Sequence, residues 1–153
     1  WKDYLEHCEL MDVQHDKYPQ DIRKAHDDIM VAYDAAKSKI DDKELAKIAD
    51  KYSSYKTTSK YYDVVMPRSV ADFVKEGNNQ HNCVGGYTGR VLNGHCRIFF
   101  IRKIDDMETS FITAECTKSG LGQLMYRNNT PVEDYDLVEY AKAFCKFILQ
   151  KGW

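Results

Sequence analysis

Hydrophobic positions in the first sixty residues recur at steps of three and four, which predicts helices. The first apolar stripe comprises Ile22, Ala25, His26, Ile29, Tyr33, Ala36 and Ile40. Pro19 and Asp21 supply a start signal for this helix. A second stripe comprises Leu45, Ile48, Ala49 and Tyr52. Asp41 and Asp42 suit a helix N-terminus electrostatically, so we expect the second stripe to form a separate helix. A polar link over residues 53–59 is expected to follow it.

The pattern changes at Tyr61, where residues 61–66 form a short β-prone run. Ser69 is expected to cap a brief helix, and Gly77 is expected to end it. Residues 78–82 then read as a loop of hydrogen-bonding side chains, and residues 84–92 predict a second short helix that ends at Asn93-Gly94.

Three strand-like runs follow, at residues 97–103, 109–117 and 122–127. Turn-like residues separate them, and such short links require antiparallel pairing, so the runs predict a meander. A last helix is expected to begin near Thr130-Pro131, because proline is favoured early in a helix. Its apolar stripe comprises Leu137, Val138, Ala141, Phe144, Cys145 and Ile148.

These elements predict an α+β fold with N-terminal helices, a central three-stranded antiparallel meander and a C-terminal helix packed on the sheet. Residues 1–60 are predicted to form a helical arm or subdomain. Residues 61–153 are predicted to form the α+β core, which carries the loop from His81 to Tyr87 and the meander.

Composition restricts the setting of this domain. The 153 residues carry a formal net charge of -2, which argues against binding to nucleic acid through bulk electrostatics alone. No stretch approaches the roughly 18 to 20 apolar residues of a membrane span, and no signal-peptide pattern is present. Five scattered cysteines indicate reduced thiols, so we expect a cytoplasmic protein without membrane contact. The chain opens on Trp1 without an initiator Met, which suggests a trimmed domain.

The loop around Cys83 is the first candidate site. Cys83 is expected at the N-terminus of the short helix, where unpaired N–H groups favour a thiolate. His81 or His95 would then act as a base, which is the arrangement that nucleophilic catalysis needs. The alternative is that Cys83 packs beneath the loop and that His81 only fixes the loop by a hydrogen bond.

The second predicted strand has one polar and one apolar face. Ile112, Ala114 and Cys116 should meet the core, whereas Thr113 and Glu115 should be exposed or should line a groove. A two-residue turn at Ser119-Gly120 places Glu115 opposite Leu124, and a one-residue slip places it opposite Gln123. If Glu115, Gln123 and Arg102 converge beside Cys83 they form a site, and otherwise they form an ordinary polar face.

Two further chemistries are open. His81, Cys83, Cys96 and Cys116 are potential zinc ligands, but the chain has no C-x2-C pair, so we predict no metal and no cofactor. A sheet with basic and aromatic side chains is a common platform for single-stranded nucleic acid. The side chains of that kind are Arg97, Arg102, Lys103, Arg127, Tyr87 and Tyr126, and Asp105, Asp106 and Glu108 dilute their charge.

The order and spacing of several short motifs carry a family resemblance. The motifs are Trp1 to Leu5, Tyr18-Pro19, Ala25 to Asp27, Pro67 to Ser69, Glu76-Gly77, His81 to Tyr87, Gly94, Ile98 to Arg102, Thr113 to Glu115, Gln123 and Asn128. Together they resemble the PcfJ-like family, proteins of conjugative plasmids, phages and related mobile elements of bacteria. The resemblance implies a mobile-element setting and marks the residues to examine.

Three readings of the chain follow. In the first it is an accessory binding or regulatory domain whose groove, between the Cys83 loop and the Glu115/Gln123 strands, holds a protein or nucleic acid. Its binding residues would be Tyr87, Arg102, Thr113, Gln123, Arg127 and Asn128. In the second it is an enzyme with Cys83 as nucleophile, His81 or His95 as base, and Glu115 or Gln123 as an orienting group. In the third these residues only stabilise the fold, with Arg102 and Glu115 as an ion pair beneath the loop.

Overall fold

The computed structural model describes residues 22–153 of the chain, so Pro19 and Asp21 lie outside the described residues. The chain groups into two compact units, Trp1–Ile40 and Asp41–Trp153. The domain boundary predicted near residue 60 stays a prediction. No helix in the described part of the chain combines the length and apolar character that crossing a bilayer requires.

The first described helix, α2, runs without interruption over Ile22–Lys51. The prediction of two helices is wrong, because nothing between Ile40 and Leu45 breaks a helix: the junction contains neither glycine nor proline. Asp42 lies inside α2, and its Oδ1 accepts a hydrogen bond from the Val70 backbone N–H at 2.8 Å. The Asp42 carboxylate therefore caps the helix that begins at Val70, and it does not mark the start of a second helix within residues 22–51.

Residues 22–153 contain one sheet of five antiparallel strands in chain order. The strands are β1 (Tyr62–Val65), β2 (Arg97–Lys103), β3 (Ile112–Thr117), β4 (Gly120–Tyr126) and β5 (Thr130–Pro131). The predicted meander is its centre, but the prediction of three strands is wrong. The β-prone run at β1 pairs with the far side of β2, with Val64 opposite Ile101. Thr130 and Pro131 pair with the end of β4 instead of opening the last helix.

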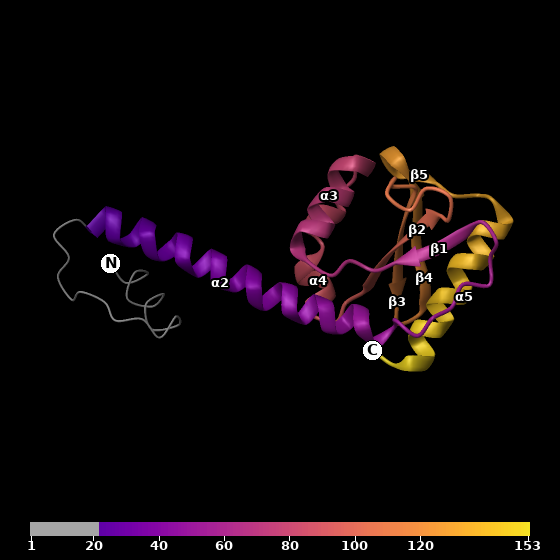
Figure 1. The fold of residues 1–153 in the computed structure, drawn as a ribbon, viewed down its shortest axis with the longest axis horizontal. Coiled ribbons are helices and arrows are strands. Elements are labelled where there is room, and N and C mark those ends of the chain that lie inside the picture. The colour runs from indigo at the N-terminus through magenta and orange to yellow at the C-terminus, as the bar shows by residue number, and fades with distance from the viewer. Residues whose placement is uncertain (1–21) are drawn as a thin grey trace. The chain divides into compact units, whose positions relative to one another are not determined.

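One face of the sheet packs on the last helix, α5 (Tyr135–Lys151), as the alternation in β3 predicts (Figure 1). Asp134 caps α5, accepting a hydrogen bond from the Leu137 backbone N–H at 3.1 Å, so the helix begins later than expected. This core comprises Phe99, Ile101, Ile112, Ala114, Cys116 and Leu124 from the sheet, and Leu137, Ala141, Phe144, Cys145 and Ile148 from α5.

The opposite face is also covered, by α3 (Val70–Gln80), the 3-10 turn η1 (Cys83–Gly86) and α4 (Thr88–Leu92) (Figure 1). Ile98 and Phe100 point to this side and pack against Phe73 and Val84. Burial on both faces explains why β2 reads as an unbroken apolar run, Ile98 to Ile101. The single short helix predicted for residues 84–92 is in fact divided into η1 and α4.

Ser69 caps α3 as predicted, accepting a hydrogen bond from the Asp72 backbone N–H at 3.1 Å. Gly77 does not end α3, which continues to Gln80. A Cβ at position 77 would lie 2.8 Å from the Gly85 backbone nitrogen. The glycine therefore serves the close contact of α3 with η1 rather than a helix stop.

We expect Gly77→Ala to lower the free energy of unfolding by about 1–3 kcal/mol, because the obstructing atoms belong to the backbone of η1 and cannot rotate away. Urea denaturation measures the change. Gly89→Ala in α4 is the matched control, since its Cβ would meet no atom within 4 Å. Equal losses in the two variants would contradict this account of Gly77.

A second prediction concerns alkaline pH. The Tyr140 hydroxyl contacts Thr57 Oγ1 at 2.7 Å and donates to the Tyr62 carbonyl at 3.2 Å. Burial raises the pKa of Tyr140, so the unfolded chain ionises first, near the ordinary tyrosine value of about 10. The contribution of Tyr140 to the free energy of unfolding is therefore fully present below about pH 10 and is lost as the pH rises above it. Tyr140→Phe should flatten this alkaline loss, and an unchanged slope in pH-dependent urea denaturation would count against it.

Candidate functional site

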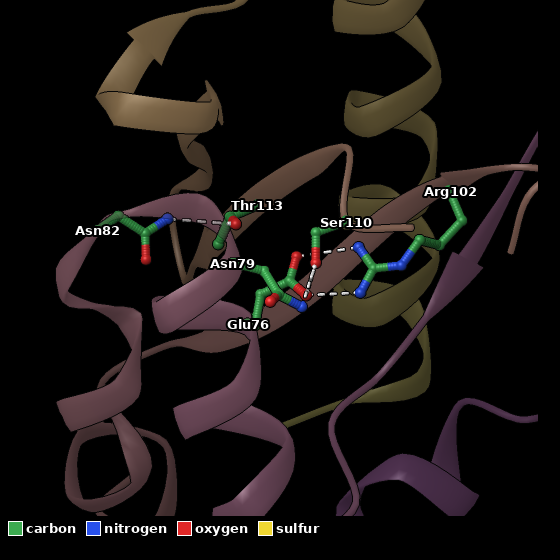
Figure 2. Close-up of polar contacts among 6 residues, drawn as sticks. All are labelled: Glu76, Asn79, Asn82, Arg102, Ser110 and Thr113. Carbon is green, nitrogen blue, oxygen red and sulfur yellow. Dashed lines mark hydrogen bonds and ion pairs between the residues drawn. The ribbon is translucent and has the colours of Figure 1, made fainter. Parts of the chain in front are cut away.

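The loop after α3 presents Cys83 above the sheet. His81 ends α3 in the left-handed conformation at φ 52° and turns the chain toward η1. Asn82 then caps η1, because its Oδ1 accepts from the Val84 backbone N–H at 3.1 Å. The Asn82 amide Nδ2 donates to Thr113 Oγ1 at 3.3 Å, which ties the loop to β3 (Figure 2). Cys83 is the first residue of η1 and is exposed.

A groove lies between this loop and the sheet, and we call it the Cys83 groove. It is a shallow groove: the space between its lining atoms is about 310 Å³ with open solvent included, of which about 20 Å³ is open to the centre of a water molecule. Its lining residues are Asn82, Cys83, Val84, Tyr87, Ile98, Thr113, Ala114, Glu115, Gln123, Met125 and Asn129. Five of the residues predicted for a site therefore share one groove: Cys83, Tyr87, Thr113, Glu115 and Gln123.

A β-bulge brings Gln123 into the groove. Ala114 pairs with Leu124 and Cys116 pairs with Leu121, so Glu115 faces two residues of β4, Gly122 and Gln123. Of the two registers expected from the sequence, the one that places Glu115 opposite Gln123 holds for Thr113 and Ala114 and ends at the bulge, whereas the one that places Glu115 opposite Leu124 is wrong. The turn also differs from the prediction, because Thr117 pairs with Gly120 and leaves Lys118 and Ser119 as its central residues.

Glu115 is a buried carboxylate with one described partner. Glu115 is 9% exposed, and its Oε2 lies 3.6 Å from Arg90 Nη1. The Arg90 guanidinium carbon lies 4.7 Å from the centroid of the Tyr87 ring. Gly122 leaves room for the carboxylate, since a Cβ there would lie 3.0 Å from Glu115 Oε1.

Cys83 and Tyr87 form the polar mouth of the groove. The Cys83 Sγ lies 3.7 Å from the Tyr87 hydroxyl, within reach of a sulfur hydrogen bond. The hydrogen bond with Cys83, followed by burial, raises the pKa of Tyr87. The phenol is therefore neutral at physiological pH and can donate a hydrogen bond to a ligand.

The remaining predicted residues lie outside the groove lining. His81 Nε2 contacts Arg127 Nη2 at 2.6 Å, and His95 is exposed. Asn128 has φ 60° in the turn between β4 and β5. The zinc alternative also fails, because Cys96 and Cys116 are buried in different cores on opposite faces of the sheet. Among residues 22–153 no group of three or more histidine, cysteine or acidic side chains is arranged to hold a metal ion.

Arg102 pairs with Glu76, so the predicted ion pair between Arg102 and Glu115 is wrong. Two hydrogen bonds join the guanidinium to the carboxylate, Nη1 to Oε1 at 2.9 Å and Nη2 to Oε2 at 2.5 Å (Figure 2). The Ser110 hydroxyl donates to Glu76 Oε2 at 2.9 Å and accepts from Asn79 Nδ2 at 3.3 Å. Arg97 and Arg102 are 5% and 7% exposed, so neither contributes to a basic surface for nucleic acid.

Sequence reasoning missed Glu76, Arg90 and Asn129 as parts of this region. Glu76 lies three positions after the buried Phe73, so a charged residue on the apolar face of α3 was the available signal. Arg90 reaches Glu115 only through the fold of α4, and Asn129 reaches the groove only through the β4–β5 turn. No sequence pattern indicates either position.

The fold and groove define an α+β domain with a mixed polar site on a five-stranded antiparallel sheet. The chain belongs to the PcfJ-like family, because the family model described as PcfJ-like protein matches residues 1–138. This match confirms the resemblance drawn from the motifs.

One relative extends beyond the chain. The uncharacterized protein Lin1253/Lin1744 of Listeria innocua is 24% identical over 157 residues, an alignment that covers 97% of the chain and 34% of that protein. The chain therefore spans about a third of the length of this relative. No solved structure shows significant similarity to the chain.

The buried pair between Arg102 and Glu76 gives a prediction for stability. Arg102→Met should cost about 3–5 kcal/mol, because it leaves the Glu76 carboxylate, 2% exposed, without its cation. The double variant Glu76→Leu/Arg102→Met should be more stable than Arg102→Met alone, since it removes both charges. A double-mutant cycle in urea measures the coupling, and additive single losses would contradict it.

Proposed function

We propose that this chain is an accessory binding or regulatory domain of a bacterial mobile genetic element, a plasmid or phage, and that it holds a partner through the Cys83 groove in the cytoplasm. Membership of the PcfJ-like family supports the mobile-element setting, including a role in conjugation or in the phage cycle. The partner is a protein or nucleic acid of the element or its host.

The observation that carries the proposal is the convergence of three elements on one groove. Cys83 comes from η1, Glu115 from β3 and Gln123 from β4, and all three line the same space. A concave site with apolar walls and a few convergent polar groups is the usual form of a binding site. Between the two kinds of partner, the Glu115 carboxylate favours a protein, since it would repel a phosphodiester.

A cysteine-dependent enzyme is the second candidate. An exposed Cys83 beside Tyr87 and Glu115 favours it. The histidines weigh against it: His81 is engaged by Arg127, and His95 does not line the groove. A nucleophile needs a base within hydrogen-bond reach, and the described hydrogen bond of Cys83 is to the Tyr87 hydroxyl.

Site-specific photocrosslinking tests the binding function. A benzophenone amino acid at Gln123, which is exposed in the groove, should capture one defined partner in cells that carry the gene. The same probe at Lys118, exposed in the β3–β4 turn, is the matched control and should not capture it. Identical products at both positions, or none at Gln123, would refute the groove as the contact surface.

Cys83→Ser separates the two candidate functions. Under the binding proposal this variant keeps the Gln123 crosslink, because the hydroxyl still fills the mouth of the groove. Cys83 should also react with N-ethylmaleimide no faster than free cysteine, since His81 is engaged by Arg127 and His95 does not line the groove. Strongly accelerated alkylation, together with loss of function in Cys83→Ser, would favour the enzyme.

A further inference from the structure

The Glu115 carboxylate is largely buried, its oxygens keep some contact with solvent, and no described side chain donates a hydrogen bond to them. Burying a carboxylate is costly unless close donors compensate it. Arg90 Nη1, at 3.6 Å, is beyond hydrogen-bond distance, and within residues 22–153 the carboxylate has no closer donor. The site therefore has unused capacity to bind a cationic donor.

Arg90 already shows which kind of group fits there. Its guanidinium lies over the Tyr87 ring at 4.7 Å and extends toward Glu115. Stacking on an aromatic face while pairing with a carboxylate suits a planar guanidinium better than an ammonium. Arg90 is not held firmly, however, because 47% of its side chain is exposed and such pairs are weak in water.

The groove contains further acceptors that are free to bind. Gln123 and Asn129 line it, and neither side chain has a hydrogen bond to another residue in the described part of the chain. Asn82 differs, since both ends of its amide are already used. A guanidinium offers five N–H donors, so it can satisfy Glu115 and a neutral amide oxygen together.

We propose that the Cys83 groove binds the guanidinium of an arginine side chain of a partner protein, and that Arg90 is an internal competitor which occupies the rim of the groove until the partner replaces it. This inference rests on the proposed binding function and specifies the chemistry of its ligand. It assigns Glu115 as the charged contact, Tyr87 as the stacking surface, and Gln123 and Asn129 as acceptors.

The test uses N-acetyl-arginine amide as the probe and N-acetyl-citrulline amide as its neutral isostere. N-acetyl-lysine amide distinguishes a guanidinium from an ammonium. Occupancy is measured as protection of Cys83 from N-ethylmaleimide in a Cys8→Ser background, because the other described cysteines are buried. The arginine probe should protect Cys83, the citrulline probe should not, and the lysine probe should protect it less than the arginine probe.

Two variants test the roles assigned to Glu115 and Arg90, and a third serves as the control. Glu115→Gln should weaken binding of the arginine probe at least about tenfold, as expected for loss of a charged hydrogen bond. Arg90→Gln should instead strengthen it roughly two- to fivefold, because a weak competing pair is removed. Glu133→Gln, an exposed acid outside the groove, is the matched control and should change nothing. Arg90 is exposed, so its variant stays informative even if Glu115→Gln fails to fold.

The outcomes separate this inference from the proposed function. Equal protection by the arginine and citrulline probes, equal or better protection by the lysine probe, or weaker arginine binding in Arg90→Gln would overturn the guanidinium assignment. If the Gln123 crosslink persists in that case, the groove remains a binding surface for a different group. Loss of both protection and the crosslink would overturn the two proposals together.

Discussion

The buried pair between Glu76 and Arg102 is the interaction on which the site depends. Glu76 lies in α3 and Arg102 in β2, so the pair fixes the helix on one face of the sheet. Ser110, from the segment before β3, joins the same carboxylate and adds a third element to the contact. Because the Cys83 loop follows α3 directly, its height above β3 and β4 is set by this anchor.

The groove combines a rigid floor with a more accessible rim. Thr113 and Glu115 lie on a central strand that is covered on both faces, and Asn82 binds the loop to Thr113. Arg90 and Gln123 at the rim are exposed. Under the proposed binding function, a floor held by these contacts and an exposed rim would permit selective binding without remodelling of the fold.

Local signals predicted much of this structure. The cap of α3, the strand β2 and the helix α5 could be predicted because their signals lie close together in the sequence. These signals are Ser69, the apolar run of β2 and the apolar stripe of α5. Gly77 was misread as a helix stop, because its role is a contact with η1 that only the tertiary structure creates. The pairing of β1 with β2, and the whole of β5, were missed for a related reason. β1 pairs across an inserted helical segment, and the two residues of β5 are too few to give a strand pattern.

The candidate site was predicted in part. Alternation placed Glu115 and Thr113 on one face, but their partners depended on long-range geometry that spacing does not reveal. The bulge at Glu115 also determines how sequence changes in β4 would affect the groove. Substitutions in β4 change single side chains, whereas the loss of one residue there would remove the bulge and reset which side chains face the groove. A small insertion or deletion in this hairpin would therefore change which side chains line the groove, while the anchor between α3 and β2 is left intact.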